Sequence, residues 1–377
     1  MSWIEERWWD PRARAGAMLA PLAPAEWGFR AGAALRTALF ERGVLARTAA
    51  AAPVISIGNI AVGGAGKTPA AIAVARRLRA RGRRVAVLSR GYGASRDDPR
   101  IACDGERLLL DAAAAGDEPL VIARAVPGVA VLCGPSRAAI ARIAIERLRA
   151  DALVLDDGFQ HRALERDLDI VVVDASNPRG NGHLLPRGPN REPWSALSRA
   201  GLVWLSRVDR ASPEALQALR QDARRATGCD PVESIHAPAA VLDGHLAREH
   251  GLSALQGAPL LALSALARPW GFHRTLEELG ARVVEARSFR DHHAFSDAEL
   301  EEAFATAARA GARVATTEKD AVRLSSRWAA HPALRVIRIE ARITAGEALL
   351  DRLLLDALVR GDRRRAGAPA AARMDSR

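Results

Sequence analysis

Short apolar runs alternate with amphipathic segments along this chain, starting near residue 50. Two of the amphipathic segments, 68–81 and 136–149, place apolar residues at helical spacing with arginines on the opposite side. Continuous apolar strands that alternate with helices are typical of a parallel sheet covered on both faces. The pattern therefore predicts an α/β fold with a mostly parallel sheet. The expected strands lie at 53–60, 84–89, 129–134, 151–157, 168–174 and 201–209.

A second, smaller group of apolar runs and helical segments begins near residue 231, which predicts a second α/β unit. Its expected strands lie at 258–265, 282–289, 312–320 and 334–343, and its expected helices at 271–279 and 297–310. The chain then divides into an amphipathic N-terminal segment at 1–50, a larger α/β domain at 51–230, a smaller α/β domain at 231–345, and a helix end with a disordered basic tail at 346–377. We expect the tail to start at Arg360.

The N-terminal segment concentrates tryptophan and arginine, and residues 27–45 alternate apolar and arginine positions at helical spacing. Two interpretations fit: a helix at a bilayer interface, or a helix packed on its own domain. No transmembrane helix is predicted, because the uncharged stretch AGAMLAPLAPA is short and contains two prolines. Acidic residues occupy the place of a basic n-region, so no cleavable signal is predicted. The segment holds half of the eight tryptophans, namely Trp3, Trp8, Trp9 and Trp27.

The formal net charge of this 377-residue chain is +11, and 49% of its residues are hydrophobic. This composition supports a packed core and favours an anionic partner, such as nucleic acid, a phosphate-bearing substrate or an anionic membrane face. The three cysteines lack paired spacing and form no C-x-x-C cluster. We therefore expect reduced cysteines in a cytosolic protein.

The apolar strand at 53–60 runs into the sequence GGAGKT, whose lysine is one of only two in the chain, Lys67 and Lys319. Glycines let backbone N–H groups approach a phosphate, and the helix that follows presents its positive N-terminal end. Lys67 is then placed to reach the β- and γ-phosphates of a nucleotide, and Thr68 to hold Mg²⁺. The expected nucleotide-binding residues are Ala61, Val62, Gly63, Gly64, Ala65, Gly66, Lys67 and Thr68, with Ala61 where the usual motif opens with glycine.

Two adjacent acids, Asp156 and Asp157, end the apolar run at 151–157. Carboxylates at the end of a buried strand are costly unless a cation lies there, so one of them should hold Mg²⁺ opposite Thr68. Together with GGAGKT, the pair predicts a P-loop nucleotide-binding protein. These motifs alone leave open whether the phosphate goes to water, to a metabolite or nowhere.

Further blocks extend the pattern: GNIAVGGAGKTP, SRGYG, AGDEP, DDGFQHRAL, GNGHLLPRGPNRE, FRDHHAFS and TEKDAVRL. In this order, between residues 54 and 324, they resemble the tetraacyldisaccharide 4'-kinase family, the lipid A 4'-kinases. The resemblance implies transfer of the ATP γ-phosphate to the 4'-hydroxyl of a tetraacyldisaccharide 1-phosphate. It also implies a P-loop domain at 51–230, a cleft against the smaller domain, and peripheral attachment of the N-terminal helix to the cytoplasmic face of the inner membrane. We expect no nucleic acid and no obligate protein partner.

The resemblance assigns Asp117 as the base, assisted by His292 rather than His293. An isolated aspartate is a weak base because its ordinary pKa is about 4, and a histidine partner can orient it and share the proton. The block TEKD, which contains Lys319, is expected to serve structure or base recognition rather than catalysis. The remaining residues expected to line the substrate site are Tyr92, Glu118, Arg137, His161, Asn181, Arg187, Arg191 and Glu192, with the three arginines as anion contacts.

One stretch departs from the family pattern: Ala265 and Ala267 stand where glycines are expected, in a loop predicted to border the nucleotide. Two alternative functions also fit the P-loop. A regulatory or assembly NTPase would leave AGDEP and DHH unexplained, and a soluble small-molecule kinase or ligase would leave the Trp/Arg segment unexplained.

Overall fold

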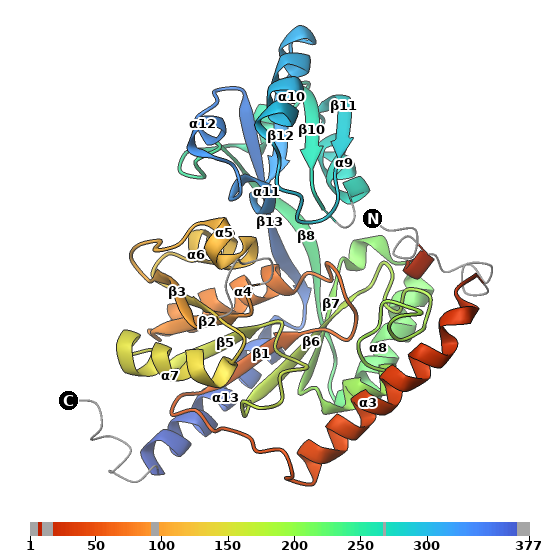
Figure 1. Ribbon diagram of the computed structural model, residues 1–377, viewed down its shortest axis with the longest axis vertical. Coiled ribbons are helices and arrows are strands. Elements are labelled where there is room, and N and C mark those ends of the chain that lie inside the picture. The colour runs from red at the N-terminus through yellow and green to blue at the C-terminus, as the bar shows by residue number, and fades with distance from the viewer. Residues whose placement is uncertain (1–6, 10–17, 92–97, 267–268, 368–377) are drawn as a thin grey trace.

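The computed structural model describes residues 7–9, 18–91, 98–266 and 269–367. Figure 1 shows a larger lobe and a smaller lobe, with two long strands, β8 and β13, running between them. The strands are β1 Val54–Gly58, β2 Val85–Ser89, β3 Arg100–Asp104, β4 Ala130–Cys133, β5 Ala152–Asp156, β6 Leu168–Asp174, β7 Leu202–Ser206, β8 Val232–Leu242, β9 Glu249–His250, β10 Pro259–Ser264, β11 Arg282–Ser288, β12 Arg313–Thr317 and β13 Leu334–Ala345. The helices are α3 Ala23–Glu41, α4 Lys67–Ala80, α5 Ala112–Ala115, α6 Asp117–Ala125, α7 Arg137–Leu148, α8 Pro213–Thr227, α9 Pro269–Glu278, α10 Asp297–Arg309, α11 Glu318–Ala321, α12 Ser326–Ala329 and α13 Glu347–Gly367.

The larger lobe has the strand order β3-β4-β2-β5-β1-β6-β7-β8, and all of these strands pair in parallel except the edge strand β3. Alternate side chains of each strand point to opposite faces. One face packs against α4, α6 and α13, and the other against α7 and α8. Burial on both faces explains why these strands are continuous apolar runs. The predicted α/β fold with a mostly parallel sheet is confirmed.

The two lobes share one sheet, because β8 and β13 pair in antiparallel register and continue into β12, β10 and β11 of the smaller lobe. The sequence analysis did not predict β8. The middle of this strand runs between the two lobes and is only partly buried, so its sequence is not a continuous apolar run. It includes Glu233, His236 and Pro238. The smaller lobe also packs helices on both faces of its strands, α10 on one and α9 on the other.

The C-terminal helix corrects the predicted start of the tail. Residues from Arg360 to Gly367 belong to α13, which packs on the larger lobe. Arg364 donates to Asp167 at 2.6 Å, and a Cβ at Gly361 would come within 2.4 Å of Pro53 Cα, so the helix lies close against the lobe. These contacts stabilise a segment whose composition alone predicted disorder. Residues 368–377 lie outside the described part of the chain.

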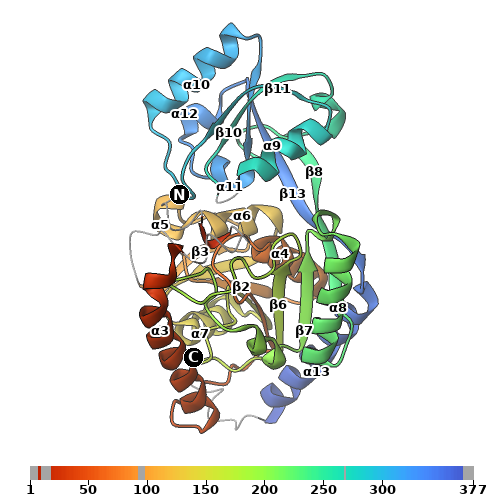
Figure 2. The same cartoon turned by 90° about the vertical axis from the view of Figure 1, so that its right-hand side faces the viewer.

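The N-terminal helix α3 lies along one side of the larger lobe (Figure 2). Its Trp27 is 68% exposed and Leu35 is 61% exposed. Trp8 and Trp9 behave differently: Trp8 Nε1 donates to the carbonyl of Pro186 at 3.1 Å, and Trp9 lies against the glycine loop. Trp8 and Trp9 are therefore half-buried against their own protein, whereas Trp27 of α3 is exposed, and the membrane interpretation of the segment stays a prediction. Among the described residues, no helix has the length and hydropathy needed to span a bilayer.

Candidate active site

The glycine loop joins β1 to α4 and turns through two left-handed residues. Gly63 and Gly66 have φ of 89° and 90°, values that favour glycine. A Cβ at Gly66 would come within 2.6 Å of Nε2 of His236, so the close approach of β8 also requires glycine. The loop delivers the chain to Lys67, the first residue of α4. Backbone N–H groups at this helix start are free of intrahelical partners, which makes the turn suitable for an anion.

Lys67, Arg191 and Asp157 form a network of polar contacts with the glycine loop. Lys67 Nζ contacts the carbonyl of Gly63 at 3.4 Å and lies 3.7 Å from a carboxylate oxygen of Asp157. Arg191 donates to both carboxylate oxygens of Asp157 at 3.0 Å and to the carbonyl of Ala61 at 3.2 Å. Burial alone would raise the pKa of Asp157, but Lys67 and Arg191 hold it below its ordinary value. Asp157 is therefore the ionised partner of Lys67 and Arg191.

Asp156 lies at the end of β5 and is 1% exposed. Both of its carboxylate oxygens are buried, with no hydrogen-bond partner in the part of the chain that the structure describes. Burial, followed by the nearby charges of Glu118 and Asp157, raises its pKa to about 8. An orphaned buried carboxylate beside a phosphate loop is the donor expected for a divalent cation, with hydroxyl and phosphate oxygens completing the coordination. Thr68, the second residue of α4, fits the hydroxyl role. Within the described residues, no group of three or more His, Cys, Asp or Glu side chains could hold a metal alone.

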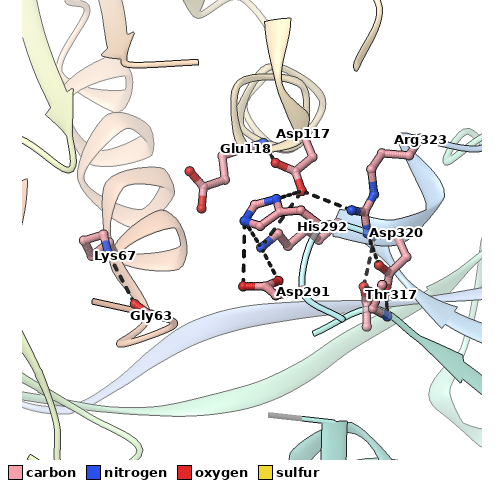
Figure 3. Close-up of polar contacts among 11 residues, drawn as sticks. Gly63, Lys67, Asp117, Glu118, Asp291, His292, Thr317, Asp320 and Arg323 are labelled. Carbon is pink, nitrogen blue, oxygen red and sulfur yellow. Dashed lines mark hydrogen bonds and ion pairs between the residues drawn. The ribbon is translucent and has the colours of Figure 1, made fainter. Parts of the chain in front are cut away.

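A carboxylate and an imidazole meet across the two lobes (Figure 3). Asp117 begins α6 of the larger lobe and is 4% exposed, and its Oδ2 lies 2.9 Å from Nδ1 of His292 on the loop between β11 and α10. Its other oxygen accepts a hydrogen bond from the N–H of Glu118 at 2.9 Å. The hydrogen bond with Asp117 raises the pKa of His292. The structure thus brings together the two predicted catalytic residues.

Lys319, on α11, also contacts this pair, and the sequence analysis did not give it a catalytic role. Its Nζ lies 3.0 Å from Asp291, 3.2 Å from Nε2 of His292 and 3.9 Å from Asp117. Arg323 contributes a second cation 3.9 Å from Asp117. Burial alone would raise the pKa of Asp117, but His292, Lys319 and Arg323 together lower it below its ordinary value. The rarity of lysine, used above for Lys67, was the signal that could have identified Lys319.

A cationic group lies at the start of α7. Arg137 is 3% exposed, donates to the carbonyl of Gly134 at 2.8 Å and leaves its Nε without a partner among the described residues. Burial lowers its pKa to about 10. His161 accepts from the backbone N–H of Arg137 at 3.4 Å, and burial, followed by the charge of Arg137 and nearby arginines, lowers the pKa of His161 to about 4. These two predicted substrate residues therefore lie together, one cationic and one neutral.

The other predicted substrate residues have contacts within the protein. Asn181 donates to the carbonyl of Arg187 at 3.0 Å and shapes its own loop. Arg187 lies 3.5 Å from Glu26 of α3. Glu192 accepts from Gln160 at 2.9 Å and from Arg199 at 2.6 Å. Figure 3 shows Glu118 on the side of Asp117 that faces Lys67. Tyr92 lies outside the described residues.

A cavity of about 140 Å³ lies between the glycine loop and the smaller lobe. Its apolar side is formed by α9 and β13, and its polar side includes His236 and Arg207. Arg207 donates to the carbonyl of Gly64 at 2.8 Å, so the cavity adjoins the phosphate loop. Burial, followed by the charge of Arg207, lowers the pKa of His236 to about 3, which keeps its imidazole neutral. The lining residues include Trp270, Phe272, Thr275, Thr317 and Ile339.

Comparison with known proteins identifies the family of this chain. The family model described as tetraacyldisaccharide-1-P 4'-kinase (LpxK) matches residues 18–359. The chain belongs to this LpxK family. The match covers the glycine loop, the acid pair and both members of the Asp117–His292 contact.

Individual LpxK relatives cover nearly all of the chain. A tetraacyldisaccharide 4'-kinase of Anaeromyxobacter sp. (strain Fw109-5) is 64% identical over 96% of this chain and 98% of its own length. The enzyme of that name from Geobacter sulfurreducens is 40% identical over 78% of this chain and 81% of its own length. A crystal structure titled as "apo" form LpxK from Aquifex aeolicus in complex with ATP superimposes with a TM-score of 0.76 at 28% identity, covering 90% of this chain and 99% of that chain.

Proposed function

We propose that this protein is an ATP-dependent kinase that transfers the γ-phosphate of ATP to the 4'-hydroxyl of a tetraacyldisaccharide 1-phosphate in lipid A biosynthesis. The proposal rests on the 2.9 Å contact between Asp117 and His292. Such a carboxylate–imidazole pair can take the proton of an acceptor hydroxyl. A regulatory NTPase transfers phosphate to water and has no sugar hydroxyl to deprotonate, so that function would leave the pair unexplained. The LpxK relatives carry the name of this activity.

The phosphates of ATP are assigned to the turn from Ala61 to Thr68, with Lys67 as the point charge on the β- and γ-phosphates. Mg²⁺ is assigned to Thr68 and the pair Asp156 and Asp157, where it neutralises charge on the transferred phosphate when bound. Arg191 supports this site by holding both Asp157 and the loop carbonyl of Ala61.

Asp117 is assigned as the base that takes the proton of the acceptor hydroxyl. Burial beside His292 fixes its orientation and removes it from bulk water. His292 donates from Nδ1 to Asp117 and shares the additional proton once it arrives. The 1-phosphate and sugar of the acceptor are assigned to Arg137, His161 and the other predicted substrate residues except Arg191, which is assigned to the ATP site because of its contacts with Asp157 and Ala61.

The adenosine of ATP is assigned to the cavity beside Arg207 and His236. Its apolar wall, with Trp270 and Phe272, suits a purine ring, and its contact with the glycine loop puts the ring within reach of bound phosphates. Because this wall belongs to the smaller lobe, a nucleotide bound here touches both lobes. We therefore propose that residues 51–230 form a domain that binds the phosphates and the acceptor. Residues 231–345 form a smaller domain that completes the nucleotide site.

The protein is proposed to act at the cytoplasmic face of the inner membrane, as a peripheral protein attached through α3. Trp27, Phe29 and Leu35 are exposed on this helix, and arginines lie among them. An apolar surface with interfacial tryptophan and arginine is typical of a helix lying in the headgroup region.

One assay tests the proposed activity. Purified protein, γ-labelled ATP, Mg²⁺ and tetraacyldisaccharide 1-phosphate in detergent micelles should give labelled lipid. Release of labelled inorganic phosphate without labelled lipid would favour the regulatory NTPase. Equal labelling of a water-soluble, deacylated disaccharide would favour the soluble small-molecule kinase. Folded, ATP-binding protein that labels neither acceptor would overturn the proposal.

A further inference from the structure

Three elements converge on the imidazole of His292. Asp117 and Glu118 come from α6, Asp291 and His292 from the loop before α10, and Lys319 from α11, with Arg323 just beyond it (Figure 3). Asp117 contacts Nδ1 of the ring at 2.9 Å, and Lys319 contacts Nε2 at 3.2 Å. Asp291 lies farther from Nε2, at 3.7 Å. The nearest partner of Nδ1 is therefore an acid and the nearest partner of Nε2 a cation.

With Lys319 charged and Asp117 ionised, the two short contacts of the ring fit one arrangement of protons. An ammonium group has donors and no acceptor, so Lys319 must donate to a lone pair on Nε2. An ionised carboxylate has acceptors and no donor, so Nδ1 must carry the hydrogen that reaches Asp117. The acids around Lys319, above all Asp291, outweigh its burial and raise its pKa, which keeps it charged.

We propose that Lys319 is a positioning residue for phosphoryl transfer, holding His292 as the neutral Nδ1–H tautomer so that the Asp117–His292 pair can accept the proton of the substrate hydroxyl. A second proton on Nε2 would place an N–H against the ammonium group, and this repulsion disfavours it. Lys319 thus opposes the rise in the pKa of His292 that Asp117 and Asp291 cause, and this favours a singly protonated pair before the substrate supplies a proton. Asp291, at 3.0 Å, holds the ammonium group in place.

This role rests on the proposed function, yet one of its tests needs no substrate. In protein labelled with ¹⁵N at its nine histidines, NMR of the wild type at pH 7.5 should show His292 with a protonated Nδ1 and an unprotonated Nε2. The His292→Gln variant assigns the signal. A protonated Nε2, or a doubly protonated ring, would overturn the inference even if the enzyme is fully active.

The second test is the pH dependence of kcat/KM for lipid phosphorylation. Removing the ammonium group lets the pair take a proton more easily, so the acidic limb of the Lys319→Met profile should move to higher pH by about one to two units. Its activity should recover towards alkaline pH. Lys319→Arg keeps the positive charge and should hold the limb within about half a unit of the wild type. Arg327→Met, which removes an exposed cation of α12 that pairs with Glu301, should not move it.

The outcomes separate the two claims. If Lys319→Met lowers activity equally at every pH while ATP binding and melting temperature are retained, Lys319 has a merely structural or phosphate-binding role and the inference fails. If Lys319→Met does not fold, the wild-type tautomer and Lys319→Arg profile still decide. Wild-type protein that shows the expected tautomer but phosphorylates no lipid would refute the proposed function and leave the arrangement of Lys319 and His292 intact.

Discussion

Glu26 of α3 accepts a hydrogen bond from the backbone N–H of Leu184 at 3.0 Å, which ties the exposed N-terminal helix to the loop that carries Arg191. Glu26 is only 2% exposed, although most of its helix faces solvent. Arg187 lies 3.5 Å from the same carboxylate. The helix proposed to face the lipid is thereby joined through a buried acid to the loop that carries Arg191.

The first prediction concerns this tie. Glu26→Ala leaves the buried N–H of Leu184 without an acceptor and should lower the free energy of unfolding by about 1–3 kcal/mol. Urea denaturation measures the change. Glu41→Ala, at the end of the same helix, should cost only about 0–1 kcal/mol, because the Glu41 carboxylate is exposed and its contact with Arg162 is long, at 3.4 Å. Equal destabilisation by the two substitutions would contradict the assigned role of Glu26.

The second prediction tests the lipid-facing surface of α3. Trp27→Ser should reduce binding to vesicles containing anionic phospholipid by about tenfold, since the indole loses its place at the interface. Sedimentation with sucrose-loaded vesicles measures the bound fraction. Leu355→Ser changes an exposed apolar residue of α13 and should leave vesicle binding unaltered. If both variants bind vesicles like the wild type, α3 is not the attachment surface.

The third prediction follows from Asp156. Its pKa of about 8 in the folded chain exceeds the ordinary value of 3.8, so between these pH values the folded state holds a proton that the unfolded state releases. Folding stability without Mg²⁺ should therefore fall as pH rises through this window. Asp156→Asn removes that contribution and should gain more than about 1 kcal/mol relative to wild type between pH 5 and pH 8.

Thermal unfolding in chelator-treated buffer measures this difference between pH 5 and pH 8. The downward shift of Asp157 is present in both proteins and cancels in the comparison. With ATP and Mg²⁺ added at pH 8, the wild type should gain stability and Asp156→Asn much less. Parallel pH profiles of the two proteins without metal would show that Asp156 is ionised in the folded chain.

The fourth prediction concerns the planar group of Arg191. Lysine cannot contact both oxygens of Asp157 and the carbonyl of Ala61 at once, so Arg191→Lys should lower kcat/KM by about 10- to 100-fold and weaken ATP binding. Calorimetric titration and the lipid assay measure the two effects. Arg179→Lys provides the matched control. Arg179 lies in the same loop as Arg191, and its contact is with Asp222 of α8. If Arg191→Lys binds ATP with unchanged affinity, Arg191 does not contribute to the nucleotide site.

Six strands of the larger lobe were predictable because both faces of their sheet are buried, which leaves a continuous apolar run in the sequence: β1, β2, β4, β5, β6 and β7. The partly exposed edge strand β3, the strand β8 and the last turns of α13 were not predicted. β8 crosses from one core to the other, and Arg364 and Gly361 are ordered by tertiary contacts with Asp167 and Pro53 that no local pattern records.

Some residues of the site were also predictable from local sequence, and others were not. Lys67 and the pair Asp156 and Asp157 follow from local spacing at strand ends. The contact of Asp117 with His292 joins residues 175 positions apart, and only the resemblance to a family predicted it. The importance of Glu26 and His236 comes from burial against other elements, for which the sequence holds no signal. Lys319 was within reach of the sequence, since its rarity alone distinguished it.

The central claim is that Asp117 serves proton removal in phosphoryl transfer and not nucleotide binding. Single-turnover transfer from γ-labelled ATP to tetraacyldisaccharide 1-phosphate, measured in parallel with ATP affinity, tests it most directly. Asp117→Ala should bind ATP within about twofold of the wild type and transfer phosphate about 10²- to 10⁴-fold more slowly. Transfer at the wild-type rate, or an equal loss of ATP binding and transfer, would contradict the account.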